Sequence, residues 1–342
     1  MFGWSEGPRT LKLSSKKHAP LVGLDIEAGS VAAAEVVTNG NVRVGRTGVA
    51  PLPPGVTRDG EITDPDALGA TLKELFAQTK LPKEVRVGVA NQRVVVRTLR
   101  LPQIDDPKEL ETAIRFQAQD HIPMPLEQSV LDYQVVAQRI GADQRQMDVV
   151  VVAARRDMVS GLVDALRAAG LKPAGIDVAA FGMIRALASE VGVPEDAHAA
   201  SYEQRAFGEG VGESTQVQIP AKLYCNLGDV TNLAVAQGPT CLFTRVSSFG
   251  IEGIAQRLAE RRGLTLEHAR QWLAHVGLAR PVEEIEGDPE IVQACRDVLA
   301  EGASKLADEL RLSLDYYGAQ EGALAVEEIV ACGPGTMGDG VS

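Results

Sequence analysis

The sequence predicts a two-lobed α/β protein that carries a small strand–helix–strand–strand subdomain. A strand, a glycine-containing turn and a second strand follow one another near Asp25, and the same unit recurs near Asn226, which indicates two similar halves. Between these units, residues 82–154 run in the order strand, helix, strand, strand. At 342 residues the chain is long enough for two domains, each with its own core.

Composition and charge exclude several classes of protein. Apolar residues make up 45% of the chain and charged residues 23%, as in an ordinary soluble protein. The net charge of −12 argues against a nucleic-acid partner, because phosphate contacts need a basic surface. The longest apolar run, 149–154, is far shorter than the ~20 residues of a membrane helix. The 4 cysteines lack CxxC spacing and indicate free thiols in a reducing cytosol.

The first lobe is predicted over residues 21–81 and 155–194. Residues 1–20 are expected to be a flexible leader, since they lack the apolar core and cleavage site of a secretory signal. The first strand, Leu21–Ile26, ends in the turn Glu27-Ala28-Gly29-Ser30. Asn39-Gly40 predicts a tight hairpin turn, and Asp64-Pro65 predicts the start of a helix.

The subdomain is predicted over residues 82–154. Val85, Val87 and Val89 alternate with polar or small residues as in a half-buried strand, and 94–98 supply another strand. Asp106-Pro107 then predicts a capped helix that stops before Pro123, and two strands follow at 130–138 and 147–153. A helix over 157–169 returns the chain to the first lobe.

The second lobe is predicted over residues 219–342. Residues 195–218 are acidic and have no apolar period, which predicts a mobile loop. Beyond it we expect a hairpin over 223–236, helices over 251–262 and 266–276, a long helix from Asp288-Pro289 and a final strand over 326–332. The few residues after Gly335 make a poor helix, so we expect the C-terminal return to the first lobe to be missing.

Two glycine turns on hairpins, one per half, are what an actin-type nucleotide cleft requires. Backbone N–H groups in such turns can hold phosphate, small hydroxyl residues can add hydrogen bonds, and a later glycine loop lets the backbone approach the nucleoside. Each turn alone is weak evidence, because most such turns only connect strands. The candidate ATP-binding residues are Asp25, Gly29, Ser30, Asn226, Gly228, Asp229, Thr231, Asn232, Gly250, Gly333 and Gly335.

Several longer segments resemble the PilM family of type IV pilus assembly proteins. The most specific are Ala113–Ala118 (AIRFQA), Ile122–Leu126 (IPMPL) and 131–133 (LDY). Residues 23–26, 151–156, 226–232, 243–245 and 312–317 are also similar to that family. The resemblance extends over nearly all of residues 21–335, and its Ile-Pro-x-Pro segment is much more specific than the phosphate turns.

The resemblance implies an actin-like fold related to FtsA, with an SHS2-type subdomain in place of the actin insertion. It implies ATP and Mg²⁺ between the lobes and a docked N-terminal peptide from a PilN-like membrane protein. It also implies contact with other pilus subunits, a homo-oligomeric ring, and a cytoplasmic position at the inner face of the cell membrane through the partner. The expected peptide-binding residues are Phe116, Ile122, Pro123, Met124, Pro125 and Leu126.

The sequence departs from the family pattern inside the expected cleft. Glu27 stands where glycine or a small residue is common, and its carboxylate would repel phosphate. Ala32 stands where a lysine or other polar residue is frequent, and Asn226 replaces an aspartate that helps to hold the metal in actin-like ATPases. An amide is a weaker magnesium ligand than a carboxylate and cannot act as a base. We therefore expect ATP binding with at most very weak hydrolysis, no catalytic residue and no separate metal site.

Two other functions remain open from the sequence. A sugar or acetate kinase of the same fold would need an aspartate base for the substrate hydroxyl, and no residue can be nominated. An FtsA-like division filament protein should carry a C-terminal amphipathic membrane helix, and no such pattern ends this sequence.

Overall fold

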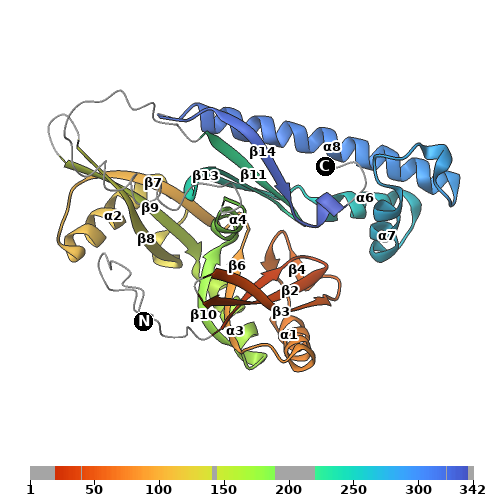
Figure 1. Ribbon diagram of the computed structural model, residues 1–342, viewed down its shortest axis with the longest axis horizontal. Helices are drawn as coiled ribbons and strands as arrows, with labels where there is room; N and C mark the ends of the chain where they lie inside the picture. The colour runs from red at the N-terminus through yellow and green to blue at the C-terminus, as the bar shows by residue number, and fades with distance from the viewer. Residues whose placement is uncertain (1–19, 40, 141–144, 189–219, 321, 338–342) are drawn as a thin grey trace.

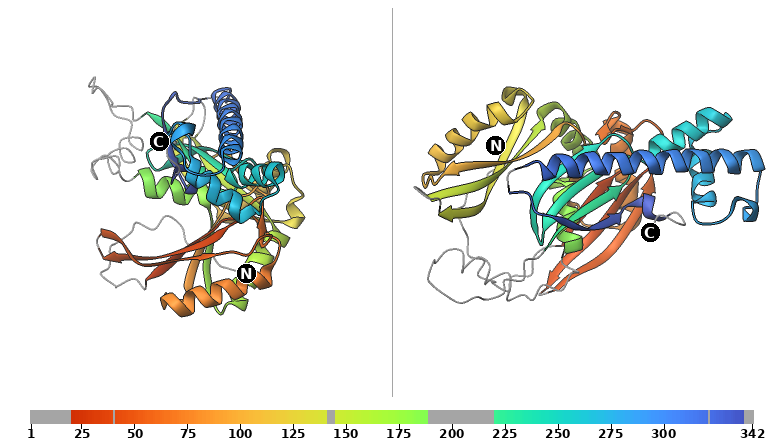
Figure 2. Two further views of the ribbon diagram at one scale, coloured as in Figure 1. Left: turned by 90° about the vertical axis from the view of Figure 1, so that its right-hand side faces the viewer. Right: turned by 90° about the horizontal axis from the view of Figure 1, so that it is seen from above.

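The computed structural model describes residues 20–39, 41–140, 145–188, 220–320 and 322–337, so the predicted acidic loop at 195–218 lies outside the described residues. Two lobes face each other, and a third unit, which we call the wing, projects to one side (Figure 1). Figure 2 shows the same three parts from the side and from above. Within the described ranges, no helix is both long and apolar enough to cross a membrane.

The first lobe is built on a five-stranded sheet with the order β10-β6-β1-β2-β3. Its strands are β1 (Leu21–Ile26), β2 (Ser30–Asn39), β3 (Asn41–Pro51), β6 (Glu84–Val89) and β10 (Lys172–Val178), with a small hairpin of β4 (Thr57–Arg58) and β5 (Glu61–Ile62). Helices α1 (Pro65–Thr79) and α3 (Arg156–Ala168) pack on this sheet and share one apolar core with it.

The second lobe is built on a four-stranded sheet with the order β13-β12-β11-β14. Its strands are β11 (Ala221–Leu227), β12 (Thr231–Gln237), β13 (Thr240–Ser247) and β14 (Val326–Cys332). The long helix α8 (Pro289–Gly318) covers one face and α4 (Ala179–Leu187) covers the other. Helices α6 (Ile251–Arg262) and α7 (Leu266–Val276) form a separate apolar cluster with the first half of α8. Short 3₁₀ turns lie at η3 (Val282–Glu284) and η4 (Pro334–Met337).

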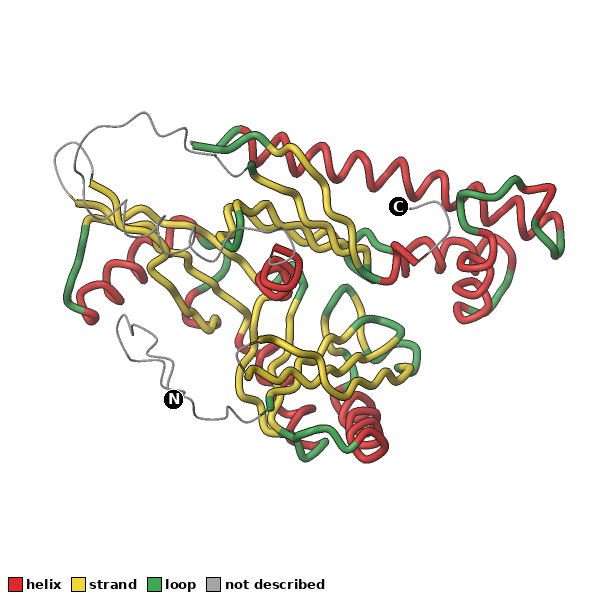
Figure 3. Tube along the Cα trace, viewed as in Figure 1, coloured by secondary structure: helices red, strands yellow, loops and turns green. Residues whose placement is uncertain are grey.

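The wing has a three-stranded sheet with one helix on one face (Figure 3). Its elements follow in the predicted order: β7 (Val94–Pro102), α2 (Pro107–His121), the 3₁₀ turn η1 (Leu126–Gln128), β8 (Ser129–Ile140) and β9 (Arg145–Arg155). The helix buries Leu110, Ile114 and Ala118 against the sheet. The chain enters and leaves the wing at one end, because Val94 of β7 is paired with Ala154 of β9.

One predicted boundary is wrong. The strand at 84–89 was placed in the subdomain, but β6 pairs in parallel with both β1 and β10, so it belongs to the first-lobe sheet. The wing therefore begins only at β7. The alternation of Val85 and Val87 identifies a strand but carries no information about its neighbours in the sheet.

Local sequence explains where the main helices begin. Asp64, Asp106 and Asp288 each precede a proline, and each accepts hydrogen bonds from backbone N–H groups of the first helical turn. Proline fits at the first helical position because an N–H group there has no acceptor within the helix, so its absence costs no hydrogen bond. These caps fix the residues at which α1, α2 and α8 begin.

The two lobes repeat one local arrangement. In the first, β1 pairs antiparallel with β2 and parallel with β6. In the second, β11 pairs antiparallel with β12 and parallel with β14. The turn between β1 and β2 and the turn between β11 and β12 therefore occupy equivalent places, and they face each other across the interface of the lobes.

Candidate functional site

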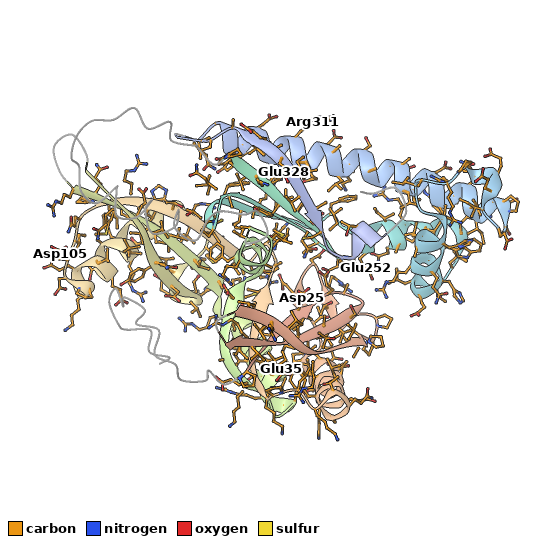
Figure 4. The ribbon with its side chains drawn as sticks, in the orientation of Figure 1. Asp25, Glu35, Asp105, Glu252, Arg311 and Glu328 are labelled. Atoms are coloured by element: carbon orange, nitrogen blue, oxygen red, sulfur yellow. The ribbon has the colours of Figure 1, made fainter. Side chains whose placement is uncertain are left out.

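The two equivalent turns meet around a small cavity of about 40 Å³. Asp25 and Glu27 line it from the first lobe, and Asn226, Asp229 and Asn232 line it from the second. Figure 4 places Asp25 on the side of the first lobe that faces the second. Of the predicted residues, Asp25, Asn226, Asp229 and Asn232 line this cavity, whereas Gly29 and Ser30 do not. A cavity of this size has room for only a few water molecules.

Glu27 crosses from one lobe to the other. Its Oε2 accepts a hydrogen bond of 2.9 Å from the backbone N–H of Asp229. The carboxyl group lies against Gly228, where a β-carbon would stand 2.3 Å from Oε2 and 2.5 Å from Oε1. Burial, first of all, and the neighbouring Asp229 carboxyl together raise the pKa of Glu27 to about 8. At neutral pH this group is therefore largely protonated.

Oxygen atoms without hydrogen-bond partners gather in the second turn. Asn226 Oδ1, Asp229 Oδ2 and Asn232 Oδ1 are buried and accept no hydrogen bond from the residues that the structure describes. Burial of the carboxyl, together with the charge of Asp229, also raises the pKa of Asp25, although the residue as a whole is solvent-exposed. Unpaired acceptors beside a carboxylate suit a hard cation such as Mg²⁺, which takes oxygen ligands.

The second turn is held by the segment before α6. Thr231 donates both its backbone N–H and its hydroxyl to the carbonyl of Phe249, at 2.9 and 2.7 Å. Ile251 N–H donates to the carbonyl of Gly228 at 2.8 Å. Gly250 permits this approach, because a β-carbon there would stand 2.2 Å from the Asp229 carbonyl oxygen. The hydroxyl of Thr231, which was predicted to bind phosphate, is thus already used in a hydrogen bond that holds the turn.

The glycine loop after β14 closes onto the same turn. Gly333 has φ +91°, a conformation that favours glycine, and a β-carbon on it would stand 1.9 Å from Asn226 Oδ1. A β-carbon on Gly335 would stand 2.4 Å from Cδ1 of Ile251. Both predicted glycines therefore let the loop pack against β11 and the start of α6.

Arg270 and Asn91 are among the residues of the site that the sequence did not predict. The guanidinium of Arg270, on α7, lies over Gly29 of the first turn, so that a β-carbon on Gly29 would stand 3.2 Å from Cζ. Arg270 is held there by Glu252, with Nε 2.9 Å from Oε2. Asn91 lines the cavity and is 1% exposed.

The last residue of the first turn is the predicted Ser30. Its hydroxyl donates no hydrogen bond that the structure shows, but its carbonyl accepts from Glu27 N–H at 2.9 Å.

The expected peptide-binding residues are only partly accessible. Phe116 is 67% exposed on α2, and Pro123 and Pro125 are exposed beyond its end. Ile122 belongs to the core of the wing, and Met124 and Leu126 pack partly buried against that core. Phe116 and the two prolines are therefore each exposed, whereas Ile122 is already covered by its own domain.

The paired sheets, facing turns and inserted wing define an actin-like fold of the ATPase type. MreB5 of Spiroplasma citri, solved bound to ADP, superposes with a TM-score of 0.50 at 12% identity over 93% of this chain and 86% of that chain, which shows the fold. A solved PilM–PilN type IV pilus biogenesis complex superposes with a TM-score of 0.70 at 27% identity, over 92% of this chain and 82% of that one.

The family model of the type IV pilus assembly protein PilM matches residues 23–203, more than half of the chain. The chain belongs to this family. The predicted family and the predicted actin-like fold are thereby confirmed.

Proposed function

We propose that this protein is an ATP-binding platform of a type IV pilus assembly machine. In this proposal it works in the cytoplasm at the inner face of the cell membrane, where it docks the N-terminal peptide of a PilN-like membrane protein and meets other pilus subunits, including copies of itself in a ring. The support is its family, together with the structural similarity to a PilM–PilN complex.

The observation that carries the nucleotide part is the set of unpaired oxygens between two facing turns. Asp25, Asn226, Asp229 and Asn232 would hold Mg²⁺, directly or through water, and the cation would supply the positive charge that triphosphate oxygens require. The cavity of about 40 Å³ is far too small for a nucleotide, so the lobes must part before ATP enters.

Calorimetry with Mg²⁺ and ATP tests this part. We expect binding together with negligible turnover, because Asn226 supplies no carboxylate at the place where actin-like ATPases have an aspartate. Sustained hydrolysis above about 1 s⁻¹, the lower end of ordinary enzyme rates, would contradict a platform role. Absence of any ATP binding up to millimolar concentration would contradict the nucleotide site itself.

The peptide part rests on the exposed Phe116. An aromatic side chain that is 67% exposed on a helix leaves apolar area open to a partner, and Pro123 and Pro125 are exposed beyond the end of the same helix. We expect a PilN-type N-terminal peptide to bind at tens of micromolar, or about −6 to −7 kcal/mol. Phe116→Ser should weaken this binding at least about tenfold, whereas Val49→Ser, at a 70% exposed valine of β3, should not. Equal affinities of both variants would move the docking surface away from α2.

A further inference from the structure

The carboxyl group of Glu27 lies where an anion would bind to the second-lobe turn. It accepts the backbone N–H of Asp229 at 2.9 Å and lies flat against Gly228, whose missing side chain leaves room for both carboxyl oxygens. Backbone N–H groups and glycine in a turn are the features that bind phosphate oxygens. The chain's own side chain thus makes the contacts that a phosphate would make there.

Glu27 is delivered to this place by the fold of the first turn. Its backbone N–H donates to the carbonyl of Ser30 at 2.9 Å, and its carbonyl accepts from the hydroxyl of Thr57 at 3.3 Å. These bonds fix the backbone of Glu27 on the first lobe, while its carboxyl group bonds to the second. The side chain therefore links the two turns that an actin-type nucleotide would otherwise link through its phosphates.

We propose that Glu27 is an internal occupant of the phosphate position and holds the two turns together in place of a nucleotide. The inference rests on the proposed nucleotide-binding function. In it, ATP and the Glu27 carboxyl group compete for the same position on the second-lobe turn. A phosphate and a carboxyl group cannot both occupy the space over Gly228, so ATP must displace Glu27 from the Asp229 N–H. Adenosine carries no phosphate and should not compete.

The first experiment compares Mg²⁺–ATP and adenosine binding to the wild type, Glu27→Ala and Glu27→Gln by calorimetry. We expect Glu27→Ala to bind Mg²⁺–ATP at least about tenfold more tightly and adenosine equally well. Glu27→Gln keeps an oxygen that can accept the Asp229 N–H, so its gain should be smaller. Glu74→Gln, on the exposed face of α1, removes a negative charge from the same lobe and should leave both affinities unchanged.

The second experiment measures the lobes without any nucleotide. Spin labels at Lys73→Cys on α1 and Glu267→Cys on α7 report the distance between the lobes by pulsed electron resonance, since both positions are exposed. The native cysteines interfere little, because burial raises their pKa values. We expect a broader distance distribution in Glu27→Ala than in the wild type, because the link between the turns is lost.

The two readouts separate the inference from the proposed function. Equal ATP affinity in all variants together with unchanged distances would overturn the role of Glu27 and leave the nucleotide site standing. A broadened distance distribution with no ATP binding in any variant would uphold the role of Glu27 as a link and contradict the nucleotide site. Unchanged distances without ATP binding would overturn both.

Discussion

A β-carbon on Gly228 would stand 2.3 Å from Oε2 of Glu27, closer than any real contact between such atoms. Gly228→Ala must therefore expel the carboxyl group from the turn, and we expect a loss of about 1–3 kcal/mol in the free energy of unfolding. In a Glu27→Ala background the same change meets no carboxyl group and should cost much less. Urea denaturation of the four proteins in this cycle measures the coupling, and additive losses would contradict the contact.

Stability should depend on pH through Glu27. Its pKa rises from the ordinary 4.5 to about 8 in the folded protein, so the folded state binds more protons than the unfolded state between these values. The contribution of Glu27 is therefore fully present below pH 4.5 and is lost as pH rises through 8. Chemical denaturation at pH 5.5 and 8.5 should show a larger loss in the wild type than in Glu27→Gln, which cannot titrate.

The matched control for this pH dependence is Glu74→Gln on the exposed face of α1. It should lose the same amount of stability as the wild type between the two pH values. If Glu27→Gln and the wild type also fall by equal amounts, the protonated carboxyl at the turn is not present in solution.

Restoring a carboxylate at Asn226 should make stability depend on magnesium. Asn226→Asp places a fourth acid beside Asp25, Glu27 and Asp229, and like charges in a buried cleft repel. Without Mg²⁺ we expect a loss of about 1–2 kcal/mol, and millimolar Mg²⁺ should recover most of it. Gln78→Glu on exposed α1 adds the same charge outside the cleft, so its melting temperature should not respond to Mg²⁺.

The cysteines should be unreactive in the folded protein. Burial raises the pKa of the Cys225 and Cys241 thiols to about 12 and that of Cys295 to about 11, and it also raises the pKa of Cys332. The reactive thiolate is then scarce at pH 8. Labelling with a disulfide reagent should proceed over hours in the native protein and within seconds in denaturant. Complete native labelling within a minute would show that the second-lobe core opens readily.

Much of the fold could be predicted because its signals are local. Asp-Pro pairs mark the helix starts at Asp64, Asp106 and Asp288, and the alternation of apolar residues marks the strands. The partners of a strand are a different matter. The parallel pairing of β6 with β1 joins residues far apart in sequence, and nothing in the six residues of β6 indicates which sheet they enter.

In the site, too, the local turns could be predicted from the sequence, whereas the contacts between the lobes could not. The turns at Asp25 and Asn226 are local patterns, and Glu27 was recognisable as an unusual residue for the first turn. That its carboxyl group would enter the opposite turn follows only from the way the lobes meet. The approach of Arg270 to Gly29 also arises between lobes, so no spacing in the sequence could have indicated it.

The attachment of the wing determines how the protein carries mechanical load. Only a few residues separate β6 from β7, and β9 runs directly into α3, so a pull on the wing reaches the first lobe through two adjacent chains. On one of these routes the tension acts along β6, which is bonded on both sides, to β1 and to β10. Pulling a strand along its own axis loads its interstrand hydrogen bonds in shear, all at once instead of one after another. A membrane partner seated on the wing would therefore be tethered through a strand that is hydrogen-bonded on both sides within the first-lobe sheet.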